Sequence, residues 1–329
     1  MLDSFNQYRN KNGFINLNLV LKEEINQMKK LRFFSFILGN DIYSFRNSDG
    51  IRYDIRELIN EEISKQARHN NASYDLAIYN GNIGMLTKIF TRPEEKLITG
   101  QELLQHASLN SIDNTLYNYL LALKNDGAND SSIKNITRQM LEEYILDIFT
   151  IQNDRNSTNL GFMKKTSSYQ LAPRFDSEDS FFSYMNEEEM KDLLKSKKRK
   201  ETIAELITRS LPKDKLSELR LLSTVNPSDL IIDYWESFTW QTVPVAKKEK
   251  LLKNNLEKEI KDTYIIISEA MKTMNLFIDK ASQINFEEIY YYFNQHNIRL
   301  SNIEREFYRI IYETRVEMFF DQKQKIKNR

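Results

Sequence analysis

The stretch that decides the fold is NDRNSTNLGFMKKTSSYQLAPRFDS, residues 153–177. It contains two short runs rich in apolar and aromatic side chains, residues 160–164 and 169–173, joined by a polar segment at residues 165–168. Short runs of this kind on either side of a polar turn are typical of a β-hairpin. We therefore predict that residues 160–164 pair antiparallel with residues 169–173.

Polar side chains stand at both ends of this hairpin. Asp154 and Asn159 precede it, and Asp176 follows it. Because the two ends of an antiparallel hairpin lie side by side, we expect Asn159 and Asp176 to be neighbours, with Asp154 reaching the same point from the preceding loop. Carboxylate and amide oxygens suit one or two Mg²⁺ ions. Phosphoryl transfer needs such metals, together with a carboxylate that orients the attacking hydroxyl.

A simpler interpretation is that these side chains only cap helices and fill turns, which is the commonest use of Asp and Asn. The functional interpretation is favoured because three separate placements agree with it. Asp154 and Asn159 are five positions apart in one loop, a short hairpin and then Asp176 follow, and β-forming sequence lies ahead while helix-forming sequence lies behind.

The chain ahead of residue 100 predicts a small α+β lobe. Seven of the eight glycines fall before residue 130, where they separate runs rich in β-branched and aromatic residues. The predicted elements are a hairpin of residues 33–38 with 42–46, a helix at 55–65, and a hairpin of residues 74–79 with 83–90.

The rest of the chain predicts helices. Candidates are residues 101–107, 113–124 and 131–151, and then everything after Asp176, including a long apolar repeat at 246–279. We therefore expect an α+β protein with two lobes. Residues 1–90 would form the N-lobe, and residues 91–329 would form a mostly helical C-lobe.

Composition excludes several kinds of chemistry. The 329-residue chain has 47 basic and 47 acidic side chains, no cysteine and three histidines. A disulfide framework, a thiolate zinc site and a cysteine nucleophile are excluded, and a histidine-rich metal centre is disfavoured. Zero net charge gives no overall attraction to nucleic acid or anionic lipid. Because no run approaches the ~18 apolar residues of a membrane span and no signal peptide is evident, we predict a soluble cytoplasmic protein.

One local patch is strongly basic. The run KSKKRK, residues 195–200, could bind nucleic acid or act as a nuclear address in a host cell. A charge run on a helix is more often a solvated face, and the acidic residues at 187–189 precede it by two turns. We therefore favour the solvated helix face and infer no nucleic-acid partner.

At four places the sequence resembles the HipA-like serine/threonine kinases, including the CtkA type of translocated bacterial kinase. The matching segments are ELINEEIS (57–64), YDLAIYNGNIGMLTKIF (74–90), ILDIFTIQNDRNSTNLGF (145–162) and YQLAPRFD (169–176). DRNSTN also resembles the catalytic loop of phosphoinositide kinases. The resemblance implies a bilobal protein-kinase-like fold with a small β-rich N-lobe and a large, mostly helical C-lobe.

Carried over by position, the resemblance implies roles for individual residues. Asp154 would be the catalytic Asp, with Arg155 and Asn159 in the same catalytic loop. Asn159 and Asp176 would bind Mg²⁺. In the ATP site, Arg46 would stand at the position of the family's phosphate-anchoring lysine, and Glu57 or, less favoured, Glu61 would match the helix glutamate that pairs with that anchoring residue. The adenine would be bound by the backbone of a hinge formed by Thr87, Lys88, Ile89 and Phe90.

The sequence departs from the family at two of these positions. Arg46 replaces the lysine, and a planar guanidinium group is not equivalent to a compact ammonium group. Asn156 stands where the family has a histidine two residues after the catalytic Asp. A GxGxxG loop over the phosphates is also absent from the sequence. Gly39-Asn40-Asp41 or residues 26–30 are the candidates to replace it.

The expected activity is ATP- and Mg²⁺-dependent phosphoryl transfer to a serine or threonine of a protein. The first alternative is a pseudokinase, or a nucleotide-binding interaction protein with a degenerate site, which Arg46 and Asn156 favour. A helical interaction protein in which DRNSTN is coincidental is the weakest alternative. The substrate, the choice between toxin, translocated effector and housekeeping enzyme, and the choice between an antitoxin and a host protein as partner stay open. No membrane partner is expected.

Overall fold

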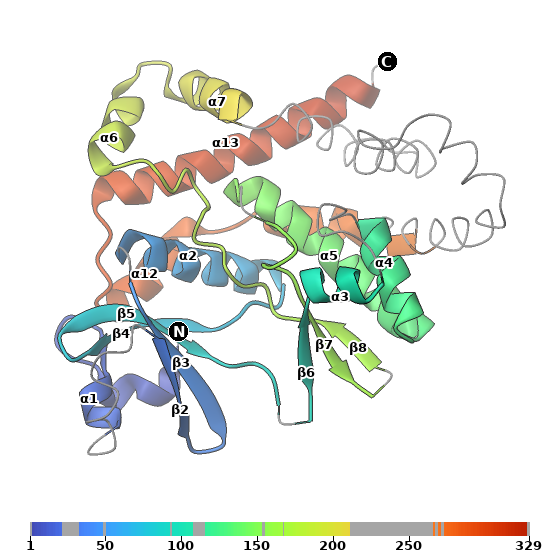
Figure 1. The fold of residues 1–329 in the computed structure, drawn as a ribbon. Coiled ribbons are helices and arrows are strands. Elements are labelled where there is room, and N and C mark those ends of the chain that lie inside the picture. Colours follow the sequence, from blue (N-terminus) through green and yellow to red (C-terminus); the bar gives the residue numbers. More distant parts are fainter. Residues whose placement is uncertain are drawn as a thin grey trace.

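The computed structural model describes residues 2–21, 33–48, 51–92, 94–107, 116–152, 155–166, 168–210, 266, 269–270 and 273–327. Within these residues the chain forms a five-stranded sheet near the N-terminus, a smaller three-stranded sheet and a helical C-terminal part (Figure 1). The helix α2 (Ile51–Ala67) lies between the five-stranded sheet and the long helix α13 (Asn302–Lys327) (Figure 1). This arrangement confirms the predicted α+β class.

The five-stranded sheet has the strand order β1-β4-β5-β3-β2. Its strands are β1 (Ile15–Asn16), β2 (Phe33–Leu38), β3 (Asp41–Asn47), β4 (Tyr74–Tyr79) and β5 (Asn82–Lys88). β2 pairs antiparallel with β3, and β4 with β5, which confirms both predicted hairpins; β3 and β5 pair antiparallel and join them. β1 pairs in parallel with β4 and was not predicted, because two residues give no periodic pattern.

The two faces of this sheet are covered by different elements. On the outer face, Phe45 packs with residues of the N-terminal segment η1 (Asp3–Tyr8) and of α1 (Leu17–Val20). On the inner face, Leu76 and Met85 pack with α2. The four apolar residues that share the predicted face of α2 are all buried, namely Ile55, Leu58, Ile59 and Ile63.

The three-stranded sheet contains the hairpin from which the sequence interpretation started. β7 (Gly161–Lys165) pairs antiparallel with β8 (Ser168–Leu171), and Phe162 lies opposite Leu171. This confirms the hairpin, with ends one or two residues from the predicted ones. A third strand, β6 (Lys96–Thr99), pairs antiparallel with β7 and was not predicted, because KLIT is a four-residue run directly before a helix.

The helices confirm most of the predicted pattern. They are α3 (Gly100–His106), α4 (Leu116–Asn125), α5 (Asp130–Thr150), α6 (Glu187–Lys195), α7 (Arg199–Ser210), α12 (Phe286–Gln295), α13 and a stretch at 273–281. The Asn129 side chain caps the start of α5, and Ile151 ends it in a left-handed conformation with φ 54°. Most of the apolar repeat predicted at 246–279 lies outside the described residues.

The segment 177–186, between Asp176 and α6, is not helical, so the prediction of helix throughout this part was wrong. Its polar groups bind α2 instead. The Asn60 side chain donates to the Ser177 carbonyl (3.2 Å) and to the Ser180 hydroxyl (2.7 Å). These partners are more than a hundred residues apart in the chain, so a local sequence pattern does not reveal them.

The largest cluster of buried apolar side chains runs through both parts of the molecule. Leu58 on α2, Phe162 on β7 and Phe307 on α13 all belong to it. α2 therefore shares its core with the helical part, although it falls on the N-lobe side of the proposed boundary. The division into residues 1–90 and 91–329 stays a prediction.

The basic run at 195–200 faces acidic neighbours. Lys195 pairs with Asp192 (2.9 Å), and Arg199 and Lys200 pair with acidic residues of α13 (2.6 and 2.5 Å). These pairs favour the solvated helix face over a nucleic-acid site. Among the described residues, no helix is long and apolar enough to cross a bilayer.

Candidate functional site

An arginine whose side chain is mostly shielded from solvent, Arg155, holds the two ends of the β7–β8 hairpin together. Nη1 of Arg155 donates to the carbonyl of Asn159 (2.8 Å) and to the carbonyl of Phe175 (2.7 Å). The backbone just before β7 and the backbone just before Asp176 therefore lie side by side. Asp154, the proposed catalytic residue, falls outside the described residues.

The carboxylate of Asp147 on α5 fixes this arginine and a second one. Oδ2 of Asp147 lies 2.9 Å from Nε of Arg155, and Oδ1 lies 2.8 Å from Nη2 of the fully buried Arg174. Burial alone would raise the pKa of Asp147, but the two guanidinium groups outweigh burial and hold this pKa below its ordinary value. Asp147 therefore stays charged and ties α5 to both the loop before β7 and the segment after β8.

Arg174 and Asp176 also connect the segment after β8 to α2, to β4 and to the residue that follows Ile151. Nη1 of Arg174 donates to Oδ1 of Asn60 on α2 (3.0 Å). Asp176 has φ 56°, its N–H donates to the Tyr74 hydroxyl (3.3 Å), and its carbonyl accepts from the side chain of Gln152 (2.9 Å). A left-handed conformation is unusual for a residue other than glycine, and such residues gather at functional sites.

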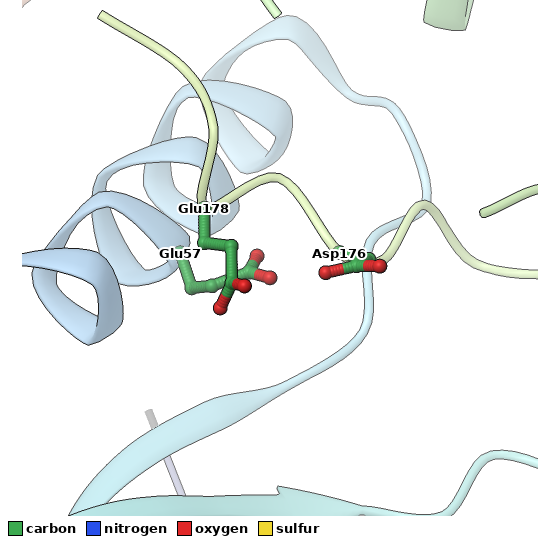
Figure 2. A group of neighbouring side chains, drawn as sticks. All are labelled: Glu57, Asp176 and Glu178. Atoms are coloured by element: carbon green, nitrogen blue, oxygen red, sulfur yellow. The ribbon is translucent and has the colours of Figure 1, made fainter. Parts of the chain in front are cut away.

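Three carboxyl groups meet where this segment passes α2. Glu57 of α2, Asp176 and Glu178 each offer an oxygen, and these oxygens all lie within 4.8 Å of one another. Figure 2 shows the carboxyl groups of Glu57 and Glu178 next to each other, with that of Asp176 pointing toward them. The sequence interpretation named Glu57 and Asp176 but missed Glu178, because an acidic residue in a polar loop carries no signal of its own.

Glu57 is the most perturbed member of this cluster. Its Oε1 accepts the backbone N–H of Ser177 (2.8 Å), while its buried Oε2 has no hydrogen-bond partner among the described residues. Burial, and next the negative charge of Asp176, raise the pKa of Glu57 to about 8. A buried carboxyl group beside two others of the same charge is unfavourable unless a proton or a cation compensates it.

Arg46 on β3 reaches the same cluster from the sheet. Its Nη2 lies 2.7 Å from Oε2 of Glu178. Burial alone would lower the pKa of Arg46, but Glu178 outweighs it, and Asp54 and Glu57 add smaller contributions, so the pKa is raised. The resemblance implied a pair between Arg46 and a glutamate of α2; the ion pair in the structure is with Glu178.

Glu61, the less favoured candidate for the helix glutamate, hydrogen-bonds to the start of β4. Its Oε2 accepts the backbone N–H of Tyr74 (3.0 Å), and its Oε1 pairs with Nζ of Lys65 (2.7 Å). These contacts indicate a structural role for Glu61. Of the two glutamates, Glu57 is therefore the one that lies in the cluster with Asp176.

The segment predicted as the hinge begins at the C-terminal end of β5. Thr87 and Lys88 end that strand, the Ile89 N–H donates to the Ile42 carbonyl (2.8 Å), and the Phe90 ring packs against that of Phe175 at 6.2 Å. The N–H groups of Lys88 and Ile89 are thus engaged by protein carbonyls. A ligand that needs a backbone N–H donor at the hinge would therefore have to find it at Phe90 or beyond.

An exposed apolar strip lies on the inner face of β2 and β3. Phe33, Ile37 and Ile42 are 60%, 72% and 37% exposed, and cross-strand register puts them on the same face as Arg46. The signal in the sequence is FFSFIL, which is apolar at positions of both faces, whereas a strand with one solvated face alternates. Gly39 forms the turn between these strands with φ 64°, and residues 26–30 lie outside the described residues.

Two residues near Asn159 have local structural roles. Oδ1 of Asn156 accepts from the N–H (2.8 Å) and the hydroxyl (2.6 Å) of Thr158, so Asn156 orders the loop by a tight turn. A Cβ on Gly161 would lie 2.9 Å from a Leu97 methyl carbon and 3.0 Å from the Ala172 Cβ. A side chain at position 161 would therefore crowd Leu97 and Ala172.

Comparison with solved structures places this arrangement in a known fold. The crystal structure of the Helicobacter pylori proinflammatory kinase CtkA aligns with 90% of this chain and 95% of its own chain, at a TM-score of 0.51 and 15% identity. HipA of Shewanella oneidensis MR-1, solved with HipB and operator DNA, aligns with 76% of this chain and 62% of its own, at a TM-score of 0.32 and 14% identity.

The chain thus has the fold of the kinase CtkA, as the sequence predicted, and it matches that structure over nearly its whole length. No protein-family model matches the sequence. No curated protein matches it either. The likeness to CtkA is one of fold, since identity is 15%.

Proposed function

We propose that this protein binds ATP and Mg²⁺ and transfers a phosphoryl group to a serine or threonine of another protein. The observation that carries the proposal is the carboxyl cluster of Glu57, Asp176 and Glu178, to which Arg46, from the inner face of the sheet, is joined by its ion pair with Glu178. Phosphoryl transfer needs a cation on the phosphates and carboxylates that hold a metal. The HipA-like kinase fold supports the same activity.

The residues at this point are suited to a hard divalent cation. The side chains of Glu57, Asp176 and Glu178 offer oxygens, and the backbone of Asn159 is held beside that of Phe175, directly before Asp176. We assign Asn159 and Asp176 as the Mg²⁺ ligands. When bound, Mg²⁺ neutralises charge on the phosphates of the nucleotide.

The exposed apolar strip supplies a surface for the adenine. Ile42 lies beside the hinge, since its carbonyl accepts the N–H of Ile89, and Ile37 lies directly opposite Ile42 across the hairpin. An aromatic base placed on this strip would have its phosphates directed toward Arg46 on the same face. In this proposal Arg46 steadies the α and β phosphates.

The loop before β7 supplies the groups that act on the substrate. Asp154 would orient the hydroxyl of the protein substrate. Arg155 is a positioning residue, because its guanidinium group joins the carbonyls of Asn159 and Phe175 and is itself held by Asp147. The protein substrate, an antitoxin or host protein as partner, a toxin or effector role and a cytoplasmic location belong to the same proposal.

A pseudokinase is the second candidate, and one contact favours it. Arg46 forms an ion pair with Glu178 at 2.7 Å, so the phosphates would have to displace or share that carboxylate. An arginine held in this way, with Asn156 in place of a histidine, is compatible with nucleotide binding without turnover.

The purified full-length chain incubated with labelled ATP and Mg²⁺ tests both candidates. Transfer to the protein itself or to a general protein substrate supports the kinase. An ATP-dependent rise in melting temperature without transfer supports the pseudokinase. If neither phosphoryl transfer nor an ATP-dependent shift in melting temperature is seen, both the kinase and the nucleotide-binding pseudokinase are ruled out.

The Ile37→Asp variant tests the position of the adenine. Ile37 is 72% exposed, so the substitution should leave the unfolding midpoint unchanged while it removes apolar contact and repels the phosphates. We expect ATP affinity to fall about 10-fold, measured by fluorescent-nucleotide titration. Leu19→Asp is the control, because Leu19 is 55% exposed on α1, at the outer face. Equal affinities for the two variants would place the nucleotide elsewhere.

A further inference from the structure

The carboxyl cluster of Glu57, Asp176 and Glu178 poses a charge problem. Three carboxylates whose oxygens lie within 4.8 Å of one another carry three negative charges when ionised. Arg46, paired with Glu178, supplies one positive charge. Two negative charges are left at a point that includes the buried Glu57, and like charges this close repel strongly in a low-dielectric site.

The unpartnered oxygen of Glu57 points to a ligand. Its Oε1 is satisfied by the N–H of Ser177, whereas Oε2 is buried and has no partner among the described residues. Buried polar atoms without a partner are rare, so each one requires an explanation. Figure 2 shows this carboxyl group next to that of Glu178, with Asp176 closing the group from the other side.

The spacing is that of a coordination sphere. Three ligand oxygens that are at most 4.8 Å apart can all lie within about 2.8 Å of one ion, so small side-chain movements bring them to the metal–oxygen distances of about 2.0–2.6 Å that Mg²⁺ and Ca²⁺ require. The donors are all carboxylate oxygens, which select Mg²⁺, Mn²⁺ or Ca²⁺ over softer metals. One divalent cation would also bring the local charge of three carboxylates and one arginine to zero.

We propose that Glu57, Asp176 and Glu178 form a divalent-cation site that fills in the absence of nucleotide. This site differs from the Asn159–Asp176 pair assigned above, because it uses Glu57 of α2 and Glu178 and does not use Asn159. The bound ion joins α2 to the segment 176–178, because each carboxylate is attracted to the ion and the repulsion between the carboxylates is offset. The proposal does not depend on phosphoryl transfer.

Titration of the full-length, chelator-treated, nucleotide-free protein with Mn²⁺ tests the site, with electron paramagnetic resonance reporting free Mn²⁺. We expect one Mn²⁺ per chain, displaced by excess Mg²⁺ or Ca²⁺. Glu178→Gln should weaken binding about 10-fold or more, and it is the decisive variant because the Glu178 side chain is 29% exposed and its removal leaves the core intact. Glu57→Gln should have the same effect, provided that its circular dichroism matches the wild type.

Two control variants give the test its specificity. Glu62→Gln removes a carboxylate of α2 that pairs with Lys65 at 2.7 Å, and Asn159→Ala removes the amide assigned to the nucleotide-bound metal. Both should retain nucleotide-free Mn²⁺ binding. No binding by the wild type, binding that survives Glu178→Gln, or binding lost in Asn159→Ala would each overturn the proposal. Phosphoryl transfer is measured separately, with ATP and Mg²⁺, and does not depend on these binding results, so the two proposals fail independently.

Discussion

The Asp176→Asn variant should transfer phosphate about 100-fold more slowly than the wild-type protein, or slower still. Asparagine keeps the size and one oxygen of the side chain but removes the charge that would bind Mg²⁺. The backbone that positions residue 176 should persist, because its N–H binds the Tyr74 hydroxyl and its carbonyl binds Gln152. The measurement is the initial rate of transfer from labelled ATP at saturating Mg²⁺.

Asp179→Asn is the matched control for this rate. Asp179 is three residues further along the same non-helical segment, and its Oδ1 accepts the Ser183 hydroxyl at 2.8 Å. We expect Asp179→Asn to transfer phosphate at close to the wild-type rate, and both variants to unfold near the wild-type midpoint. A rate for Asp176→Asn within a few-fold of the control would remove Asp176 from the metal site.

The parts of this site that the sequence predicts are those fixed by local pattern. The polar turn between two short β-forming runs places Asn159 and Asp176 at adjacent ends of one hairpin, and the helical spacing of the apolar residues of α2 leaves Glu57 on its polar side. Each of these inferences needs fewer than about 25 consecutive residues. Patterns of this length are enough to identify hairpins and amphipathic helices.

The contacts between distant segments could not be predicted in the same way. Glu178 meets Arg46 across 132 positions of sequence, and Arg174 meets Asn60 across 114. No periodicity connects such residues. The glutamate partner implied for Arg46 therefore lay on α2, whereas the observed partner, Glu178, lies in the segment after β8. The packing of Gly161 against Leu97 could not be predicted for a similar reason, since Leu97 lies on the unpredicted strand β6.

Asp147 is the residue whose loss should destabilise the fold most. Replacing Asp147 with asparagine removes the counter-ion that the buried Arg174 shares with the partly buried Arg155. Removing one partner of a buried ion pair costs about 3–5 kcal/mol, far more than the pair adds relative to an apolar replacement. We expect the free energy of unfolding, measured by urea titration at pH 7, to fall by about that amount. Asp192→Asn is the control, because its 2.9 Å pair with Lys195 is exposed to solvent, and it should unfold at the wild-type urea concentration.

The difference between wild type and Asp147→Asn should depend on pH in a defined direction. The pKa of Asp147 is lowered in the folded protein relative to its ordinary value of 3.8. A group of this kind contributes stability that is fully present above the unfolded-state pKa and is lost as the pH falls through the folded-state pKa. The gap between the free energies of unfolding of the two proteins should therefore be constant from pH 7 to about pH 5, should narrow as the pH falls below about 4, and should close once the pH is below the folded-state pKa. A gap that stays constant to pH 3 would show that the carboxylate charge is not what holds the two arginines, and that Asp147 serves the core by shape alone.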